Sequence, residues 1–353
     1  MNLSAEPVVI VGGGQSGLAG ARAVTDVGLR AVVLEAGERP VGAWPSYYDS
    51  LTLFSPARYS GIPGMPFPGQ PGRYPSRDEV VAHLEKYAAG LNGEIRTGAA
   101  VTAVEQARSG FEVQVSGGET LHASAVIAAS GSFGNPYVPA IAGRESFRGE
   151  VLHVADYRAP QSYAGKRVVV VGAGNSAVQV AYELAEVATV TLATRAPIVL
   201  LPQLRGGRDI HFWLDRLKLD LLPPAVLARL FNGTPVLDTG IYRAAIESGA
   251  MPRREMFTAF EPDGVVWPEG AREVVDVVLF ATGYRPQLPY LDGLGALAEN
   301  GMPLHRQGLS TTHPRLAYLG LEFQRSFSSN TLRGVHRDAR FVAAALVRQL
   351  RRG

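Results

Sequence analysis

The sequence has no cysteine among its 353 residues, and this absence excludes several kinds of chemistry. Disulfide bonds and thiolate metal sites need cysteine, and so does a pair of redox thiols that passes electrons to a disulfide. Histidine is scarce as well: the seven histidines show no H-E-x-x-H or comparable ligand spacing, so we expect no metal site.

An excess of one charge and a long apolar run are also missing. The net charge is +2 with no long basic run, so we expect neither a nucleic-acid nor a membrane partner. No apolar run approaches the ~18 residues of a membrane helix. The N-terminal segment MNLSAEPVVIVGGG lacks the features of a signal peptide, so we expect a cytoplasmic protein. The length favours two domains over one.

Glycine, by contrast, follows a clear pattern near the N-terminus. Four apolar residues at 8–11 suit a buried parallel strand, and Gly12, Gly14 and Gly17 follow in G-x-G-x-x-G spacing before a helical pattern. A second apolar strand ends at Glu35, as in a βαβ unit that binds a dinucleotide. The glycines permit a tight turn and close approach to a pyrophosphate, while the helix N-terminus offers N–H groups to the phosphates.

The same plan recurs at VVVVGAGNSA, residues 168–177. Gly172 and Gly174 repeat the first two glycines, and Ala177 takes the third position, where any small residue permits helix–strand packing. The chain therefore predicts two dinucleotide sites.

The two units differ in charge at one matched position. Position 35 follows Gly12 by the same number of residues as position 195 follows Gly172, and the residues there are Glu35 and Arg195. A carboxylate accepts hydrogen bonds from a ribose 2′-OH, whereas an arginine binds a 2′-phosphate, to which Thr194 adds a hydroxyl. We predict FAD or NAD at the first turn and NADPH at the second.

Two further strand-and-turn segments, 121–139 and 272–291, are typical of strands that close each nucleotide domain. We therefore predict an α/β fold of two Rossmann-like domains. The NADPH-binding domain, 146–284, is inserted into a discontinuous FAD-binding domain, 1–145 and 285–353.

Within residues 203–260, the stretch DIHFWLDRLKLDLLPPAVLARLF has amphipathic helical spacing that Pro223 and Pro224 interrupt. We predict a helical insertion on the NADPH domain. It either covers the mouth of the active site or forms a homodimer interface; a helix on a membrane surface is a third, less favoured interpretation, because the span is short and its charges are mixed.

The stretch FRGEVLHVADY lies between the two nucleotide units. Phe147, Gly149, His153 and Tyr157 match the F-x-G-x-x-x-H-x-x-x-[YFW] fingerprint of class B flavin-dependent monooxygenases. With both glycine turns and the ATGY at 281–284, nearly the whole chain resembles a flavin-containing monooxygenase of the compact bacterial type. Baeyer–Villiger enzymes usually carry Trp at the last fingerprint position, so Tyr157 favours the flavin-containing branch.

This resemblance implies a mechanism and a set of site residues. NADPH reduces FAD, the reduced flavin forms a C4a-hydroperoxide with O2, and a sulfur or nitrogen atom of a small molecule takes one oxygen. The flavin performs the chemistry, which agrees with a sequence that offers no catalytic triad or paired carboxylates. The aromatic loop after the first βαβ unit is expected to follow the flavin, with Phe54 and Ser55 near its reacting face. The expected cofactor-binding residues are Gly12, Gly14, Ser16, Gly17, Glu35, Trp44, Val101, Ser130, Gly131, Gly172, Gly174, Asn175, Ser176, Thr194, Arg195, Thr282 and Gly283.

Several alternatives stay open at this stage. A flavin reductase or oxidase that passes electrons to an external acceptor without cysteine fits the same motifs, and so do Baeyer–Villiger oxygenation of ketones and a non-enzymatic NADPH-binding protein. His153 is either a proton donor near the flavin or a residue that positions the domains. Many family members carry an Asn in the aromatic loop, and none occurs between 41 and 70, which predicts slow oxygenation or release of hydrogen peroxide.

Overall fold

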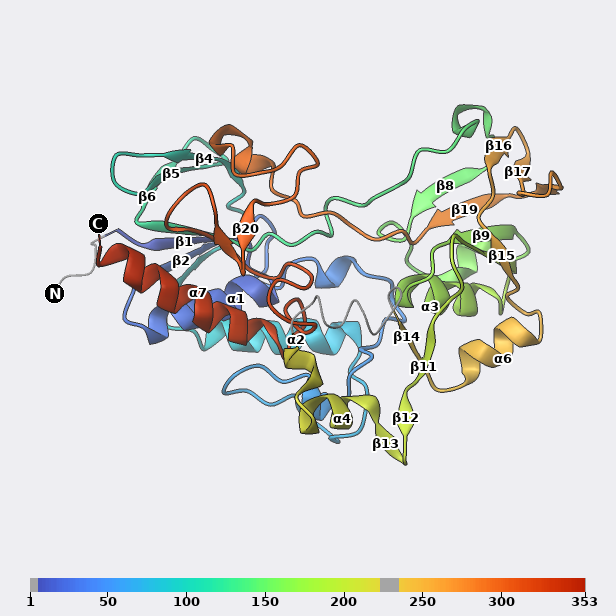
Figure 1. The fold of residues 1–353 in the computed structure, drawn as a ribbon, viewed down its shortest axis with the longest axis horizontal. Helices are drawn as coiled ribbons and strands as arrows, with labels where there is room; N and C mark the ends of the chain where they lie inside the picture. The colour runs from blue at the N-terminus through green and yellow to red at the C-terminus, as the bar shows by residue number, and fades with distance from the viewer. Residues whose placement is uncertain (1–5, 223–234, 353) are drawn as a thin grey trace.

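The computed structural model describes residues 6–222 and 235–352 and contains two parallel sheets at opposite ends of an elongated molecule (Figure 1). The first sheet has the order β20-β21-β22-β7-β1-β2-β3. Its strands from β22 to β3 pair in parallel, and β20 and β21 add an antiparallel edge. The bounds are β1 (Val8–Val11), β2 (Ala31–Leu34), β3 (Glu94–Arg96), β7 (Ala125–Ala128), β20 (His305–Arg306), β21 (Leu309–Ser310) and β22 (Leu316–Tyr318).

Both faces of the first sheet are covered, which explains why β1, β2 and β7 are apolar at every position. Helices α1 (Gln15–Asp26) and α7 (Val335–Leu350) pack on one face through alanine, valine and leucine side chains. An antiparallel sheet of β4 (Val101–Gln106), β5 (Phe111–Val115) and β6 (Thr120–Ala123) packs on the other face. Helix α2 (Arg77–Ala89) begins with a capping box between Ser76 and Glu79.

The second sheet has the order β15-β10-β9-β19-β8, and all of its strand pairs are parallel. The strands are β8 (Glu150–His153), β9 (Arg167–Val171), β10 (Thr189–Thr194), β15 (Arg253–Glu255) and β19 (Val277–Phe280). Helices α3 (Asn175–Leu184) and α6 (Ile241–Glu247) contribute to the core on one face. An antiparallel sheet of β16 (Ala259–Glu261), β17 (Gly264–Val266) and β18 (Arg272–Val274) lies on the other face, where Phe260 of β16, Val265 of β17 and the fully buried Trp267 belong to the core.

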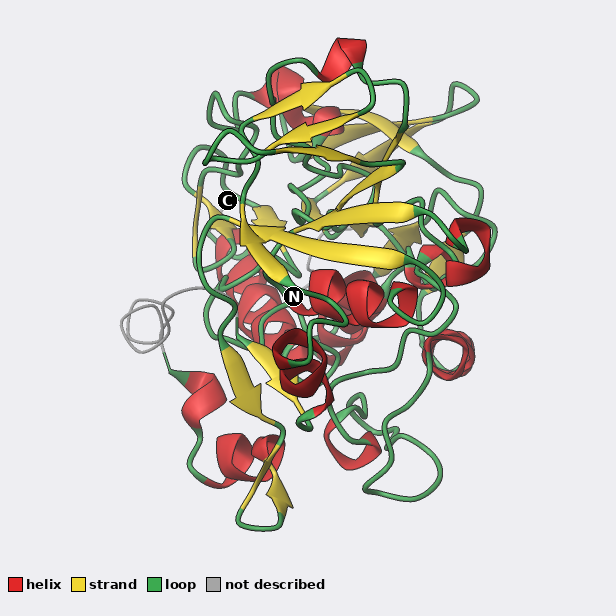
Figure 2. Cartoon of the chain, turned by 90° about the vertical axis from the view of Figure 1, so that its right-hand side faces the viewer, coloured by secondary structure: helices red, strands yellow, loops and turns green. Residues whose placement is uncertain are grey.

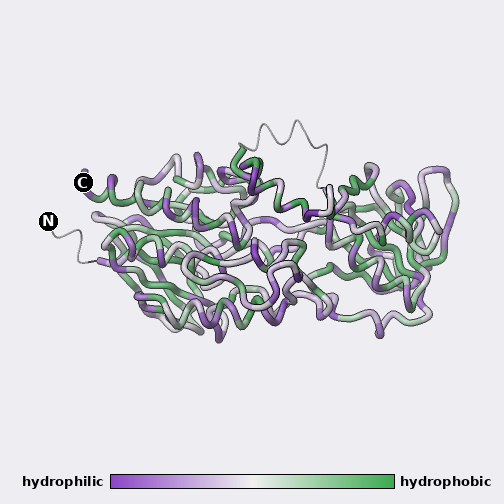
Figure 3. Tube along the Cα trace, turned by 90° about the horizontal axis from the view of Figure 1, so that it is seen from below, coloured by the Kyte–Doolittle hydropathy of each residue, from purple (hydrophilic) through white to green (hydrophobic). Residues whose placement is uncertain are grey.

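The predicted fold class is confirmed. Figure 2, which looks along the long axis, shows most of the helices below the strands, and hydrophobic segments run through the interior of both halves (Figure 3). The first sheet takes strands from 8–128 and 305–318, and the second takes its strands from 150–280, between those two parts. This strand usage accords with the predicted insertion of one domain into the other, although the boundaries at 145 and 284 stay predictions.

The prediction of a helical insertion over 203–260 is wrong in part. Helix in the described part of this stretch is confined to α4 (Ile210–Arg216), α6 and the single 3-10 turn η5 (Leu219–Leu221), while Arg253–Glu255 is the edge strand of the second sheet. Gly206 and Gly207 both have positive φ, at 58° and 68°, and so turn β12 (Leu204–Arg205) into β13 (Arg208–Asp209). Residues 223–234, with the Pro223–Pro224 break, lie outside the described residues.

A ribbon of two strands carries this stretch away from the second sheet. Strand β11 (Leu200–Pro202) pairs with β14 (Val236–Asp238), and residues 203–222 after β11 reach back towards α2 and the start of α7, as the yellow-green segment of Figure 1 shows. We call residues 200–222 the arm. Among the described residues, no helix has the length and hydropathy needed to cross a membrane.

The described residues also include short 3-10 turns in the connections. They are η1 (Trp44–Ser46), η2 (Ala57–Tyr59), η3 (Arg144–Ser146), η4 (Pro160–Tyr163) and η6 (Pro289–Leu294).

Candidate functional site

A cavity of about 1630 Å³ lies where the carboxyl ends of the two sheets meet. The segments after β1, β7, β9 and β19 all line it, as ligand sites in parallel sheets require. Pockets for one drug-sized ligand occupy roughly 300–1,000 Å³. The space therefore suits two large ligands that meet end to end.

The first glycine turn is sterically restricted to glycine at two positions. A Cβ on Gly12, where φ is 105°, would lie 2.6 Å from the Ala129 carbonyl oxygen, and a Cβ on Gly17 would lie 1.8 Å from the Gly12 oxygen. Gly14 is the N-cap of helix α1, which has no side-chain cap and no acidic residue in its first turn. Its first N–H groups are thus left for an anion, which fits a dinucleotide pyrophosphate.

Glu35 connects the end of β2 to this turn. Its Oε2 accepts a hydrogen bond of 2.5 Å from Gly13 N, its Oε1 accepts one of 2.7 Å from Gly37 N, and the residue is 8% exposed. Because Glu35 also lines the cavity, its remaining lone pairs can accept from the ribose hydroxyls of a bound adenosine.

The second glycine turn has the same geometry around α3. A Cβ on Gly172, where φ is 143°, would lie 2.4 Å from the Ala281 oxygen, whereas a Cβ on Gly174 would meet no atom within 4 Å. Gly174 is the N-cap of α3, again without a side-chain cap. The space at Gly174 lets a ligand approach the backbone, so this turn also fits a pyrophosphate.

Thr194 and Arg195, at the end of β10, both line the cavity, but they differ in whether the side chain is free to bind a phosphate. The Thr194 hydroxyl donates to Ala196 O at 2.8 Å and accepts from Arg253 Nε at 2.7 Å, and Thr194 is 2% exposed. Arg195 is exposed. The side chain available for a 2′-phosphate is therefore Arg195. Arg253, a neighbour on β15 that sequence reasoning missed, holds the end of β10 in place.

The aromatic loop after β2 lies against the start of α1. Trp44 Nε1 donates to Gln15 Oε1 at 3.1 Å, and Gln15 Nε2 donates to Asn330 O at 2.6 Å, just before α7. Sequence reasoning missed both Gln15 and Asn330, although Gln15 lies inside the first glycine motif. These bonds hold three cavity-lining segments together.

Two crossover segments, 129–137 and 281–287, line the cavity side by side. Gln287 N donates to Gly131 O and Tyr137 N donates to Gly283 O, each at 3.0 Å. The Ser130 hydroxyl donates to Gln287 O at 2.7 Å, and the Thr282 hydroxyl donates to Tyr137 O. Ser130, Gly131, Thr282 and Gly283 therefore set the path of the chain where it passes between the two halves.

His153 in the fingerprint belongs to this crossover and is 3% exposed. Its Nδ1 accepts a hydrogen bond from Ala155 N at 3.1 Å, so its Nε2 carries the hydrogen and donates to Gly283 O, also at 3.1 Å. Burial lowers the pKa of His153, which favours the neutral ring. With both nitrogens bonded to backbone, these contacts favour the positioning role over proton donation.

The predicted site residues gather in one place. Phe54 and Ser55 line the cavity, as do all the predicted cofactor-binding residues except Gly17, which packs beneath Gly12. Their contact with cofactors stays a prediction. The cofactor-binding residues found on the cavity wall are Gly12, Gly14, Ser16, Glu35, Trp44, Val101, Ser130, Gly131, Gly172, Gly174, Asn175, Ser176, Thr194, Arg195, Thr282 and Gly283.

Comparison with known proteins agrees with this geometry. A family model described as "Pyridine nucleotide-disulphide oxidoreductase" matches residues 9–202. A flavin-containing monooxygenase from Stenotrophomonas maltophilia superposes with a TM-score of 0.85 at 32% identity, covering 97% of this chain and 98% of that one. Indole-3-pyruvate monooxygenase YUCCA1 of Oryza sativa subsp. japonica is 31% identical over 370 residues, which cover 95% of this chain and 90% of the relative. The chain belongs to the flavin-dependent monooxygenase family.

Another bacterial relative has no assigned activity. The uncharacterized oxidoreductase CzcO of Bacillus subtilis is 28% identical over 337 residues and covers 95% of this chain and 97% of the relative. The two chains therefore correspond over nearly their full lengths.

The arm is held against the first half of the molecule by the largely buried carboxylate of Asp209, and it contacts the aromatic loop through His211 and Gln203. Asp209 accepts hydrogen bonds from Tyr74 OH at 2.6 Å, from Gln203 Nε2 at 2.5 Å and from His211 Nδ1 at 2.7 Å. Burial acts to raise the pKa of Asp209, but these hydrogen bonds outweigh it and lower the pKa. The His211 ring in turn stacks on Phe54, with ring centroids 6.1 Å apart. The arm therefore packs against the side chain predicted at the reacting face.

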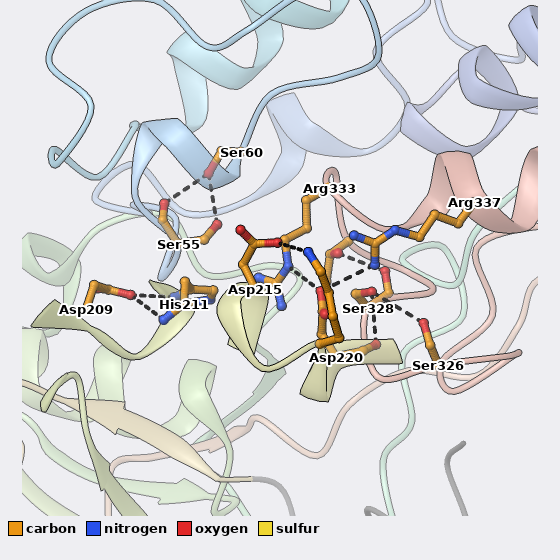
Figure 4. Close-up of polar contacts among 12 residues, drawn as sticks. Ser55, Ser60, Asp209, His211, Asp215, Asp220, Ser326, Ser328, Arg333 and Arg337 are labelled. Carbon is orange, nitrogen blue, oxygen red and sulfur yellow. Dashed lines mark hydrogen bonds and ion pairs between the residues drawn. The ribbon is translucent and has the colours of Figure 1, made fainter. Parts of the chain in front are cut away.

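A second buried acid ties the arm to the segment before α7 (Figure 4). Asp220 is 3% exposed, and its Oδ2 lies 3.3 Å from Arg333 Nε and 3.4 Å from Arg337 Nη1. The Ser328 hydroxyl donates to Asp220 O at 3.4 Å. These contacts place residues 203–222 against Arg333, which lines the cavity, while both interpretations of the stretch, a cover for the active-site mouth and a homodimer interface, stay predictions.

We expect Glu35→Ala to lower the affinity for FAD by ~10–100-fold. The variant removes the ribose acceptor and leaves two N–H groups without their carboxylate partner, each bond to a charged group being worth about 1.5–3 kcal/mol. Retained flavin, measured by absorbance after dialysis, tests this. Glu85→Ala is the control, because Glu85 forms an exposed pair with Arg39. Equal flavin retention in the two variants would contradict the role of Glu35.

Proposed function

We propose that this protein is an FAD- and NADPH-dependent monooxygenase that transfers one oxygen atom to a sulfur or nitrogen atom of a small organic molecule. The observation that carries this proposal is the single cavity between two glycine turns whose matched positions hold Glu35 and Arg195. Bound FAD supplies the redox chemistry with NADPH and O2. One oxygen atom of O2 goes to the substrate, the other leaves as water, and NADPH supplies the two electrons.

The residues of the chain bind and orient the two nucleotides. The first turns of α1 and α3 hold the pyrophosphates, Glu35 holds an unphosphorylated ribose and Arg195 selects the phosphorylated one. The crossovers at 129–137 and 281–287 keep the two turns at a constant separation. The arm covers the side of the cavity at Phe54, which limits access of water to the reacting atoms.

A second candidate is oxygenation at the carbonyl group of a 2-oxo acid. It is favoured by the rice relative, whose name gives indole-3-pyruvate as the substrate and which matches this chain over 90% of its own length. Both candidates use the same cavity and cofactors. They differ in the reacting atom of the substrate: the first candidate oxygenates a thioether or an amine, and the second oxygenates a 2-oxo acid.

We expect NADPH consumption in the presence of a thioether to yield a sulfoxide. The measurement is sulfoxide and hydrogen peroxide formed per NADPH oxidised, in parallel reactions with a thioether and with a 2-oxo acid. Peroxide in excess of sulfoxide is expected, because residues 41–70 contain no Asn. If hydrogen peroxide accounted for all of the NADPH oxidised with the thioether and also with the 2-oxo acid, the protein would be an oxidase and the proposal would fail.

We expect Arg195→Glu to abolish the preference for NADPH over NADH. The change removes a charge-assisted contact to the 2′-phosphate worth about 1.5–3 kcal/mol and places a carboxylate where a free ribose is favoured. The ratio of kcat/KM for the two coenzymes, followed by their absorbance, gives the preference. Arg205→Glu makes the same charge change on an exposed residue of the hairpin and should leave the ratio unaltered. An unchanged ratio in Arg195→Glu would remove the assignment of the second site.

A further inference from the structure

The cavity contains one buried cation that neither nucleotide uses in the proposed function. Among the described residues that line the cavity, the Asp, Glu, Lys and Arg side chains are Glu35, Arg195, Glu322 and Arg333, and His305 is the histidine there, with a pKa that burial lowers. Glu35 and Arg195 serve the two nucleotides, and Glu322 is exposed. The side chain of Arg333 is only 13% exposed, so its charge is largely removed from solvent.

The guanidinium of Arg333 has little compensation. Its Nε lies 3.3 Å from Asp220 Oδ2, longer than the ~2.7–2.9 Å of a strong charge-assisted bond. Within residues 6–222 and 235–352, Asp220 is the only hydrogen-bond partner found for Arg333, and Arg337 shares that carboxylate at 3.4 Å. A guanidinium has five N–H donors, and a buried cation without partners is costly. The nearby Asp215 is paired with Lys218 at 3.0 Å, so the two arginines that share Asp220 leave one positive charge in excess.

Arg333 lies on the side of the cavity where the reaction is expected. It is close enough to His211 to contribute to lowering the pKa of that ring, after burial as the larger cause. The His211 ring stacks on Phe54, and Phe54 and Ser55 line the same cavity as Arg333. Figure 4 shows Arg333 beside Asp215 and His211, with Ser55 nearby.

We propose that Arg333 is the substrate-binding cation of this protein: it receives the carboxylate of an anionic substrate and so holds the reacting atom near Phe54 and Ser55. The inference rests on the proposed function and adds the substrate class, small organic carboxylates. A planar guanidinium binds a carboxylate through two parallel hydrogen bonds, which fixes orientation as well as position. The incoming carboxylate also makes the group of Asp220, Arg333 and Arg337 neutral.

The test compares two variants that alter the same ion group. Arg333→Gln removes the cation that lines the cavity. Arg337→Gln removes the other arginine paired with Asp220, and Arg337 does not line the cavity. The probes are (phenylthio)acetate and its neutral amide, titrated into the oxidised flavoprotein without NADPH. Binding is read from the change in flavin absorbance, so no turnover is required, and flavin content is measured for each variant.

We expect the wild type to bind the carboxylate more tightly than the amide. Arg333→Gln should weaken carboxylate binding by ~10–100-fold and leave amide binding unchanged, as for loss of a hydrogen-bonded charge pair. Arg333→Lys should recover part of the loss, because it keeps the charge without the planar fork. Arg337→Gln removes a charge of the same group but no side chain that lines the cavity, so it should weaken carboxylate binding much less than Arg333→Gln does and leave amide binding unchanged.

Several results would overturn the inference. Equal affinity of the wild type for the carboxylate and the amide would overturn it, and this measurement does not depend on whether a variant folds. If Arg333→Gln weakened binding of both probes equally, Arg333 would serve packing. If Arg337→Gln weakened carboxylate binding as much as Arg333→Gln, Arg333 would serve to hold the arm. If Arg333→Gln alone lost flavin, Arg333 would serve the flavin. If the carboxylate binds through Arg333 but only peroxide forms on turnover, the proposed function fails and this inference stands.

Discussion

The whole account depends on one geometric constraint, which is that the carboxyl ends of two parallel sheets face a common cavity. Parallel strands place their following turns at one edge, and helix N-termini at that edge attract phosphates. Gly12 and Gly172 lie against the backbone of the neighbouring crossover, where a Cβ has no room. Each turn is therefore held by a segment that leads to the other half, and the two nucleotide sites cannot be separated without disrupting both crossovers.

The arm adds a second connection between the halves. It leaves the second sheet after β10 but makes its buried polar contacts with Tyr74 and with Arg333, both of which follow strands of the first domain. Asp209 and Asp220, at 11% and 3% side-chain exposure, would be costly if unpaired, so these contacts favour one position of the arm. The same contacts place His211 against Phe54 and bring Arg333 to the reacting side of the cavity.

Features set by local sterics or by register could be predicted from the sequence. The glycines, Glu35 and Arg195 belong to repeated strand–turn–helix units, so their places on the cavity follow from spacing alone. Contacts between distant segments could not: Arg253 reaches Thr194 across a strand pair, and Arg333 meets Asp220 after more than a hundred residues. The predicted insertion over 203–260 was too broadly helical, because only its stretch from 209 has helical spacing, and a glycine hairpin before it and the edge strand β15 after it belong to no helix.

The most direct test of the central claim is the anaerobic mixing of the purified FAD protein with NADPH in a stopped-flow spectrophotometer. If the two nucleotides meet in one cavity, the flavin absorbance is lost in a single phase at least as fast as turnover, and NADH acts more slowly. A flavin that NADPH fails to bleach, or bleaches more slowly than the enzyme turns over, would contradict the account.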